Sequence, residues 1–222
     1  MKKNFIHIIE STATGSLTAM RGLANSQKED GHNVLVIFSR RPDTPNNLTD
    51  YFNDGIELKN VQMAGFFNIF LSFFKIYKII QLFKPNIIFL TSSTAGFIGR
   101  VIGLFINKKI LIFYIPQCIS YMRKDIGVFK RFLFIFFEKI GSIKKSVLIA
   151  SSNSELNEIR KIIKNLPSHL VENAVTDEYL DLVPHQKKHK NIIHVGGIRV
   201  QKDPASFAII AKKVMQKNKD IK

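Results

Sequence analysis

The stretch from Pro85 to Arg100 reads PNIIFLTSSTAGFIGR, and its order of residue types is the clearest structural signal in the chain. Consecutive apolar residues follow the proline, then a turn rich in Ser and Thr, then small and apolar residues at helical spacing. An unbroken apolar run is typical of a strand that is covered on both faces. Hydroxyl side chains directly before a helix are common N-caps. The stretch therefore predicts a buried strand that leads into a helix.

The same order recurs along the rest of the chain. Apolar strand patterns cover Phe5–Ile9, Asn33–Phe38, Ile56–Val61, Ile87–Leu90, Lys109–Tyr114, Val147–Ala150 and Ile192–Val195. Helical patterns cover Gly15–Asp30, Phe66–Phe83, Ala95–Ile106, Phe129–Ile143, Asn153–Lys164 and Ala205–Gln216. Strands that alternate with helices predict an α/β fold, in which helices cover both faces of a parallel sheet.

Two domains of unequal length are expected. Residues 1–180 form the first domain, a complete Rossmann-like parallel sheet. The polar, basic and Pro-containing segment Asp181–Lys190 reads as a linker. Residues 191–222 then supply one strand and one helix. Because a single such unit cannot bury both faces of its strand, we expect either a partner chain to cover it or the rest of a second domain to follow.

The charge is unevenly distributed. The chain of 222 residues has a net charge of +16, and residues 75–222 carry 26 Lys and Arg against 10 Asp and Glu. Such an excess suggests a polyanionic partner, which is a phosphate ligand, an anionic membrane or a nucleic acid; a merely solubilising surface is the alternative. No helix-turn-helix pattern, zinc-ligand spacing or stacking-aromatic signature is present, so we expect no nucleic-acid binding.

The longest stretches without a charged residue are Asn60–Phe74 and Pro85–Gly99, of 15 residues each. Both are shorter than the roughly 18–20 residues that span a bilayer. The apolar run near Met1 is too short for a signal peptide, and the single cysteine, Cys118, excludes an internal disulfide. We therefore expect a cytoplasmic protein.

Two segments combine aromatic and basic residues, Phe66–Lys78 and Val128–Lys139. Helices of this composition can lie in a membrane interface. The alternative is that both are ordinary core helices whose Phe side chains are buried under the sheet. Peripheral contact with the inner face of the cytoplasmic membrane is the corresponding expectation.

Three turns on the first domain follow predicted strands, where ligands bind in open α/β sheets. After the first strand, Gly15 and Ser16 open a helix, so their amides can approach a phosphate, or Gly15 can simply serve a tight turn. Ser92 and Ser93 can cap the next helix or bind sugar hydroxyls. There is no G-x-G-x-x-G and no P-loop lysine in these turns.

The third turn lies in the stretch from Tyr114 to Asp125. The amide of Gln117 offers a donor and an acceptor to a sugar hydroxyl. Cys118 has no His at a spacing typical of a nucleophile, and we expect it to pack.

A fourth turn, HVGGIRVQKDP at residues 194–204, combines two glycines with two cations. Gly196 and Gly197 permit close approach, and Arg199 and Lys202 suit a diphosphate. The alternative is a solvated basic turn.

These pieces, in this order, resemble glycosyltransferase family 4, the retaining two-domain enzymes of GT-B fold that build bacterial surface polysaccharides such as O-antigen and capsule. The resemblance rests on Ala13–Ser16, Asp30–Val34, Ser92–Gly96, Pro116–Gln117, Ala150–Glu155, Glu172–Val175 and Gly196–Pro204, and it covers essentially the whole chain.

The resemblance implies an acceptor site on the first domain, made by Gly15, Ser16, Ser92, Ser93, Gln117 and Arg123. It implies a donor-diphosphate site made by Gly196, Gly197, Arg199 and Lys202. Three departures from the family matter: Gln117 replaces its His, Gly197 replaces its Arg, and its Glu-x7-Glu signature would lie beyond Lys222.

A nucleoside diphosphate sugar and a lipid-linked glycan acceptor are the implied substrates, without metal or other cofactor. The sequence therefore predicts a complete acceptor domain and an incomplete, truncated donor domain, inactive alone. The alternatives are a non-catalytic acceptor- or membrane-binding remnant and one half of a split enzyme, whose other chain supplies the remaining donor domain.

Overall fold

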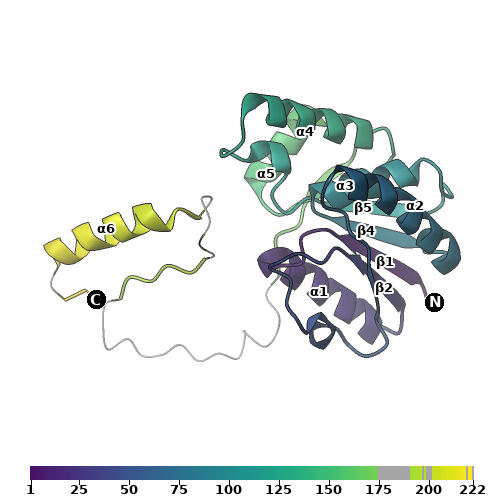
Figure 1. The fold of residues 1–222 in the computed structure, drawn as a ribbon, viewed down its shortest axis with the longest axis horizontal. Coiled ribbons are helices and arrows are strands. Elements are labelled where there is room, and N and C mark those ends of the chain that lie inside the picture. The colour runs from purple at the N-terminus through teal and green to yellow at the C-terminus, as the bar shows by residue number, and fades with distance from the viewer. Residues whose placement is uncertain (175–190, 197, 199–201, 219, 222) are drawn as a thin grey trace. The chain divides into compact units, whose positions relative to one another are not determined.

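The computed structural model describes residues 1–174, 191–196, 198, 202–218, 220 and 221 (Figure 1). The chain divides into two compact units. The first contains residues 1–122 and 128–174, and the second contains residues 123–127 and 175–222. The predicted linker Asp181–Lys190 and the predicted domain boundary at residue 180 lie outside the described residues.

The first unit is a parallel sheet of seven strands in the order β3-β2-β1-β4-β5-β6-β7, so the predicted α/β fold is confirmed. Its strands are β1 (Asn4–Ile9), β2 (Asn33–Phe38), β3 (Glu57–Asn60), β4 (Ile87–Thr91), β5 (Leu111–Ile115), β6 (Val147–Ala150) and β7 (Ser168–Leu170). Its helices are α1 (Thr14–Glu29), α2 (Phe66–Phe83), α3 (Ser93–Gly103), α4 (Val128–Gly141) and α5 (Asn153–Ile162), with 3-10 turns η1 (Leu48–Tyr51) and η2 (Ser120–Met122). The sequence did not predict β7, which has only three residues.

The second unit differs from its prediction in one respect. Residues Ile192–Val195 are not a strand, whereas α6 (Pro204–Lys217) forms as expected. A strand needs a neighbour to take up its backbone N–H and C=O groups, and none lies beside these residues in the described part of this unit. Helix α6 is capped by Asp203, whose Oδ1 accepts a hydrogen bond from the Ser206 N–H at 3.1 Å.

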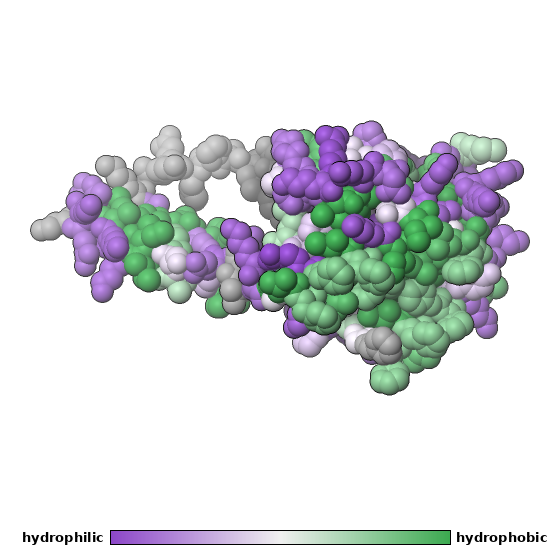
Figure 2. Space-filling view, turned by 90° about the horizontal axis from the view of Figure 1, so that it is seen from above, coloured by the Kyte–Doolittle hydropathy of each residue, from purple (hydrophilic) through white to green (hydrophobic). Residues whose placement is uncertain are grey.

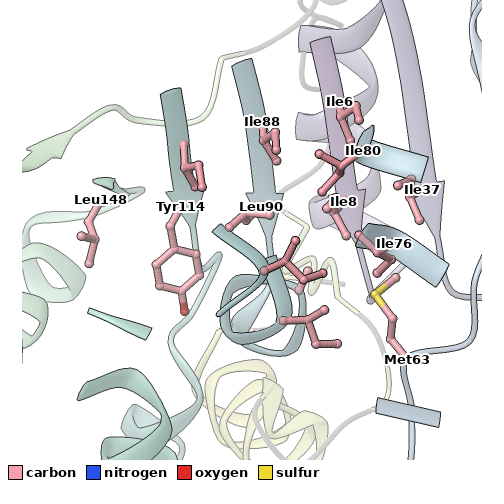
Figure 3. Packing of buried hydrophobic residues seen from close by; sticks show 14 of the residues in the cluster. Ile6, Ile8, Ile37, Met63, Ile76, Ile80, Ile88, Leu90, Tyr114 and Leu148 are labelled. Carbon is pink, nitrogen blue, oxygen red and sulfur yellow. The ribbon is translucent and has the colours of Figure 1, made fainter. Parts of the chain in front are cut away.

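Successive strand residues face opposite sides of the sheet, as a period of two requires. On one side, Phe5, Val34 and Val36 pack with Leu17 and Met20 of α1. The other side is the larger core, and it is covered by α2, α3, α4 and α5 (Figure 1). Figure 3 shows Ile80 and Ile76 of α2 beside Ile6 and Ile8 of β1. Leu90 of β4 and Tyr114 of β5 lie further along the same core.

A buried ion pair joins three elements of the larger core. The Arg100 Nη2 atom of α3 lies 2.6 Å from Oε2 of Glu138 on α4. The other carboxylate oxygen accepts a hydrogen bond from the Tyr114 hydroxyl at 2.6 Å, and the Arg100 guanidinium lies 4.1 Å from the centre of the Tyr114 ring. Burial, together with the nearby Glu138 carboxylate, raises the pKa of Tyr114 well above its usual value. Tyr114 therefore remains a hydrogen-bond donor.

The Tyr114 ring packs directly against Gly96, where a side chain would not fit. A Cβ atom at residue 96 would lie 2.2 Å from Cε2 of Tyr114, which real contacts do not allow. We expect Gly96→Ala to lower the free energy of unfolding by about 1–3 kcal/mol, since Tyr114 is held by Glu138 and cannot move aside. Gly22→Ala on α1 is the matched control, because a Cβ there would meet nothing within 4 Å. Urea denaturation that shows equal effects of both changes would contradict this account.

A second prediction concerns His7, which is fully buried in β1. Its ring stacks on Phe89 at 5.0 Å, and its Nε2 atom lies 2.8 Å from Oε1 of Gln27. Burial lowers the pKa of His7 from 6.5 to about 4. The unfolded chain thus binds the proton first as the pH falls below 6.5, and the free energy of unfolding should drop by about 3 kcal/mol between pH 6.5 and 4.

His7→Phe should remove this contribution to the pH dependence, because the apolar ring binds no proton in either state. The exposed residue His169 provides the control variant His169→Gln. Urea denaturation at several pH values measures the slope for each protein. A slope that is the same in His7→Phe as in the unchanged chain would refute the assignment to His7.

Candidate functional site

The loops after β1, β4 and β5 meet at one edge of the sheet. The parallel register places Ile9 beside Thr91 and Thr91 beside Ile115, which are the last residues of these strands. The chain leaves β1 toward β2 on one side and leaves β4 toward β5 on the other, so the strand order reverses between β1 and β4. Ligands of open α/β sheets bind in the crevice beyond such a reversal.

Helix α1 begins beside this reversal without a side-chain cap. Its N-cap residue is Ala13, which has no polar group to accept from the first amides. Gly15 is exposed, and an added Cβ would meet no atom within 4 Å. A tight turn does not require Gly15, which lies inside the first helical turn with no positive φ. The first turn, with Gly15 and the half-exposed Ser16, therefore presents amides and a positive dipole end to an anion.

Ser92 and Ser93 follow β4 and hold local structure. Ser92 caps α3, since its Oγ atom accepts a hydrogen bond from the Ala95 N–H at 3.4 Å. Its φ of +90° is uncommon for a residue other than glycine. The Ser93 Oγ atom accepts a hydrogen bond from the Ser120 N–H at 3.1 Å and lies 3.5 Å from the Tyr114 hydroxyl oxygen. The capping interpretation is thus confirmed for Ser92, and Ser93 positions the loop after β5.

Gln117 and Cys118 form a strained pair at the end of β5. Both are left-handed, with φ of +54° and +82°. The Gln117 Nε2 atom donates to Oδ1 of Asn173 at 3.0 Å, which ties this loop to the chain that follows β7. Cys118 is exposed rather than packed, so that expectation was wrong. The left-handed backbone turns the Cys118 N–H inward and leaves its thiol at the surface.

Glu155 holds two loops in place, a role that the sequence analysis did not predict. It lies in the first turn of α5 and is buried. Its Oε1 atom accepts hydrogen bonds from the backbone N–H groups of Cys118 and Ile119 at 2.8 and 3.0 Å. Its Oε2 atom accepts from the N–H and hydroxyl of Ser151 at 2.9 and 3.0 Å. One carboxylate thus fixes two neighbouring loops of the edge.

Glu10 lies directly after β1, and the sequence analysis did not name it as a candidate site residue. Its Oε1 atom lies 3.6 Å from Nη1 of Arg41, which belongs to the loop after β2. Burial raises the pKa of Glu10, and the Arg41 charge opposes that rise. Because Ile9 and Thr91 are paired, Glu10 is one residue from the strand end that leads into Ser92. A half-buried carboxyl with a raised pKa at the carboxyl edge of a parallel sheet is a candidate for a functional role.

The remaining predicted site residues belong to the second unit. The Arg123 guanidinium pairs with the Asp125 carboxylate, with Nη2–Oδ2 at 2.6 Å and Nε–Oδ1 at 3.1 Å. Gly196 and Lys202 are exposed, while Gly197 and Arg199 lie outside the described residues. The assignment of Arg123 to the acceptor site, and of the other four residues to the donor-diphosphate site, stays a prediction.

Two observations apply to the described residues as a whole. No group of three or more His, Cys, Asp or Glu side chains within them is arranged to hold a metal ion. None of the helices in this described part of the chain has the length and apolar character needed to cross a membrane.

The role of Glu155 can be tested directly. Glu155→Gln puts an amide NH2 in place of one carboxylate oxygen, so one of the two loops loses its acceptor. We expect the free energy of unfolding to fall by about 2 kcal/mol or more, and amide hydrogen exchange to accelerate at Cys118 and Ile119 or at Ser151. Glu158→Gln, on the same helix but at an exposed ion pair with Lys161, should change stability by less than about 0.5 kcal/mol. Unchanged exchange in Glu155→Gln would disprove the anchoring role.

No model of a known protein family matches the chain. An uncharacterized 41.2 kDa protein in the cps region of Klebsiella pneumoniae is 27% identical over 212 residues. The match covers 90% of this chain and 57% of the relative. The chain therefore spans less than two thirds of the length of this relative.

Solved structures are similar at low sequence identity. Sucrose-phosphate synthase from Thermosynechococcus elongatus has a TM-score of 0.70 at 13% identity, over 95% of this chain and 60% of that chain. A glycosyltransferase from Rickettsia africae has a TM-score of 0.58 at 14% identity, over 86% and 52%. UDP-GlcNAc 2-epimerase from Neisseria meningitidis, bound to UDP-GlcNAc, has a TM-score of 0.55 at 12% identity, over 77% and 47%. These similarities establish the fold, and the chain has a Rossmann-like α/β architecture of GT-B type.

Proposed function

We propose that this chain is the acceptor-binding part of a glycosyltransferase. The enzyme would transfer a sugar from a nucleoside diphosphate sugar to a lipid-linked or polysaccharide acceptor. The observation that carries the proposal is the edge where β1, β4 and β5 end, with the uncapped start of α1 on one side and the anchored Gln117 loop on the other. A relative in a cps region, and a glycosyltransferase and a UDP-GlcNAc-bound epimerase among the structural neighbours, support it.

On the acceptor side, three features have suitable chemistry. The half-exposed amide of Gln117 can donate to and accept from sugar hydroxyls, as Asn and Gln do in many binding sites. The first turn of α1 offers backbone N–H groups to a phosphate of the acceptor carrier. Glu10 lies at the same edge, where a carboxyl with a raised pKa can take the proton that the acceptor hydroxyl loses on transfer.

On the donor side, we propose that Gly196, Gly197, Arg199 and Lys202 contact the diphosphate. Cations and backbone amides would stabilise the charge of the departing nucleoside diphosphate, with no metal required. The configuration at the anomeric carbon would be retained. Because the chain spans 57% of its relative, we propose that other donor contacts come from sequence outside these 222 residues, in the same protein or a separate chain. The isolated chain would then bind acceptor without catalysing transfer.

Acceptor binding by the 222-residue chain tests this proposal. Titration with a polyprenyl diphosphate-linked glycan should give saturable binding, and Gln117→Ala should weaken it at least about fivefold, the value of a single hydrogen bond near 1 kcal/mol. Gln81→Ala, at an exposed residue near the end of α2, should bind as the unchanged chain does. The absence of saturable binding, or equal binding by both variants, would exclude the acceptor site.

The same protein should also be incubated with a panel of nucleotide sugars, with and without the acceptor. We expect no transfer product from the chain alone. Transfer would show that the donor contacts are already present, and conversion of the nucleotide sugar without acceptor would instead indicate an isomerisation like that of the 2-epimerases.

A further inference from the structure

The outer sides of α2 and α4 expose large apolar residues to an unusual degree. Eight such residues are between 48% and 83% exposed, and we call them the aromatic face: Phe67, Phe70, Leu71 and Phe74 on α2, and Val128, Phe129, Phe132 and Phe136 on α4. On α2 the opposite side, with Ile76 and Ile80, is buried against the sheet. Figure 2 shows a broad hydrophobic area on the first unit, with hydrophilic side chains along part of its border.

The two helices belong to one continuous layer. Helix α3 packs against both of them. The Phe97 ring on α3 lies 6.1 Å from the Phe73 ring of α2 and 4.9 Å from the Phe137 ring of α4, measured between ring centres. The two halves of the aromatic face are therefore held on one side of the sheet by a shared layer of rings.

The exposed charged side chains of α2 and α4 all have the same sign. From Leu58 to Lys124 the sequence contains no Asp or Glu. The one acidic residue of α4 is Glu138, which is buried against Arg100. The exposed charges of the two helices are Lys75, Lys78, Lys130, Arg131 and Lys139. A surface that is apolar at its centre and basic around it is complementary to a layer of acyl chains beneath anionic headgroups.

The aromatic face lies near the edge of the sheet that carries the candidate site. Its members lie in the first three turns of each helix. A helix that follows a parallel strand begins near the carboxyl edge of the sheet, and that edge carries Gln117 and the start of α1.

We propose that the aromatic face of α2 and α4 lies in the interface of an anionic lipid bilayer. Its Phe side chains would insert among the upper acyl chains, and its Lys and Arg side chains would contact lipid phosphates. A second copy of the chain is a poorer occupant, because a symmetric contact would bring the same basic side chains together. This inference rests on the proposed function in one respect: the bilayer would present a lipid-linked acceptor to the adjacent edge of the sheet.

Vesicle flotation of the 222-residue chain, without nucleotide sugar or acceptor, tests the surface alone. We expect binding to phosphatidylcholine vesicles in which about a third of the lipid is phosphatidylglycerol, and much weaker binding to phosphatidylcholine alone. Phe70→Ser with Phe132→Ser should lower the partition coefficient at least about tenfold. Lys75→Gln with Lys78→Gln should lower the partition coefficient about fivefold per lysine. Added salt should also lower the partition coefficient, because it screens the attraction between the basic side chains and the lipid phosphates.

Leu111→Ser and Lys164→Gln are the matched controls, because both residues are exposed but lie outside α2 and α4. They should leave binding unchanged, and urea denaturation should show that every variant folds. Equal binding to both kinds of vesicle, no binding, or full binding by the double Phe variant would overturn the proposal. A different result would also overturn it. The unchanged chain would form a dimer and not bind vesicles, and the double Phe variant would be monomeric.

The two proposals can fail independently. Vesicle binding that depends on the aromatic face, together with acceptor binding indifferent to Gln117→Ala, would keep the surface and reject the acceptor site. The reverse pair of results would reject the surface and keep the acceptor site.

Discussion

The buried ion pair between Arg100 and Glu138 holds α3, α4 and β5 together in the larger core. A guanidinium without access to water is tolerated only when its charge is compensated at close range. Here the partner comes from α4, and the Tyr114 hydroxyl on β5 completes the carboxylate's hydrogen bonds. The pair thus fixes α4, with its exposed aromatic residues, relative to α3 and to the strand that ends at the Gln117 loop. The interaction is electrostatic, but its main effect is to set the geometry of the layer.

The fold was predictable because it depends on patterns that are local in sequence. Continuous apolar runs such as Asn33–Phe38 identified the strands of the sheet, and a hydroxyl residue, Ser92, marked the start of α3. Strand β7 was not predicted, because three residues with a polar centre carry no periodic signal. The expected strand at Ile192–Val195 did not form, because strand structure depends on a neighbour that no local pattern reveals.

The site was only partly predictable for a related reason. Gln117 could be placed at the edge because it follows a recognisable strand. Ser152 caps α5, and its Oγ atom accepts a hydrogen bond from the Glu155 N–H at 3.2 Å. In a standard capping box the Glu side chain turns back to its own helix. Here it bonds to the Cys118 and Ile119 amides, 37 and 36 residues away in sequence, and only the folded chain reveals that choice.

The way in which Glu155 holds the loop has an evolutionary consequence. Its carboxylate binds main-chain N–H groups of residues 118 and 119, which every amino acid except proline possesses. The shape of the loop is therefore insulated from the identity of the side chains that it displays. Descendants of this chain can therefore exchange the side chains at 117 and 118 for others that tolerate a left-handed backbone, while inheriting the same backbone scaffold.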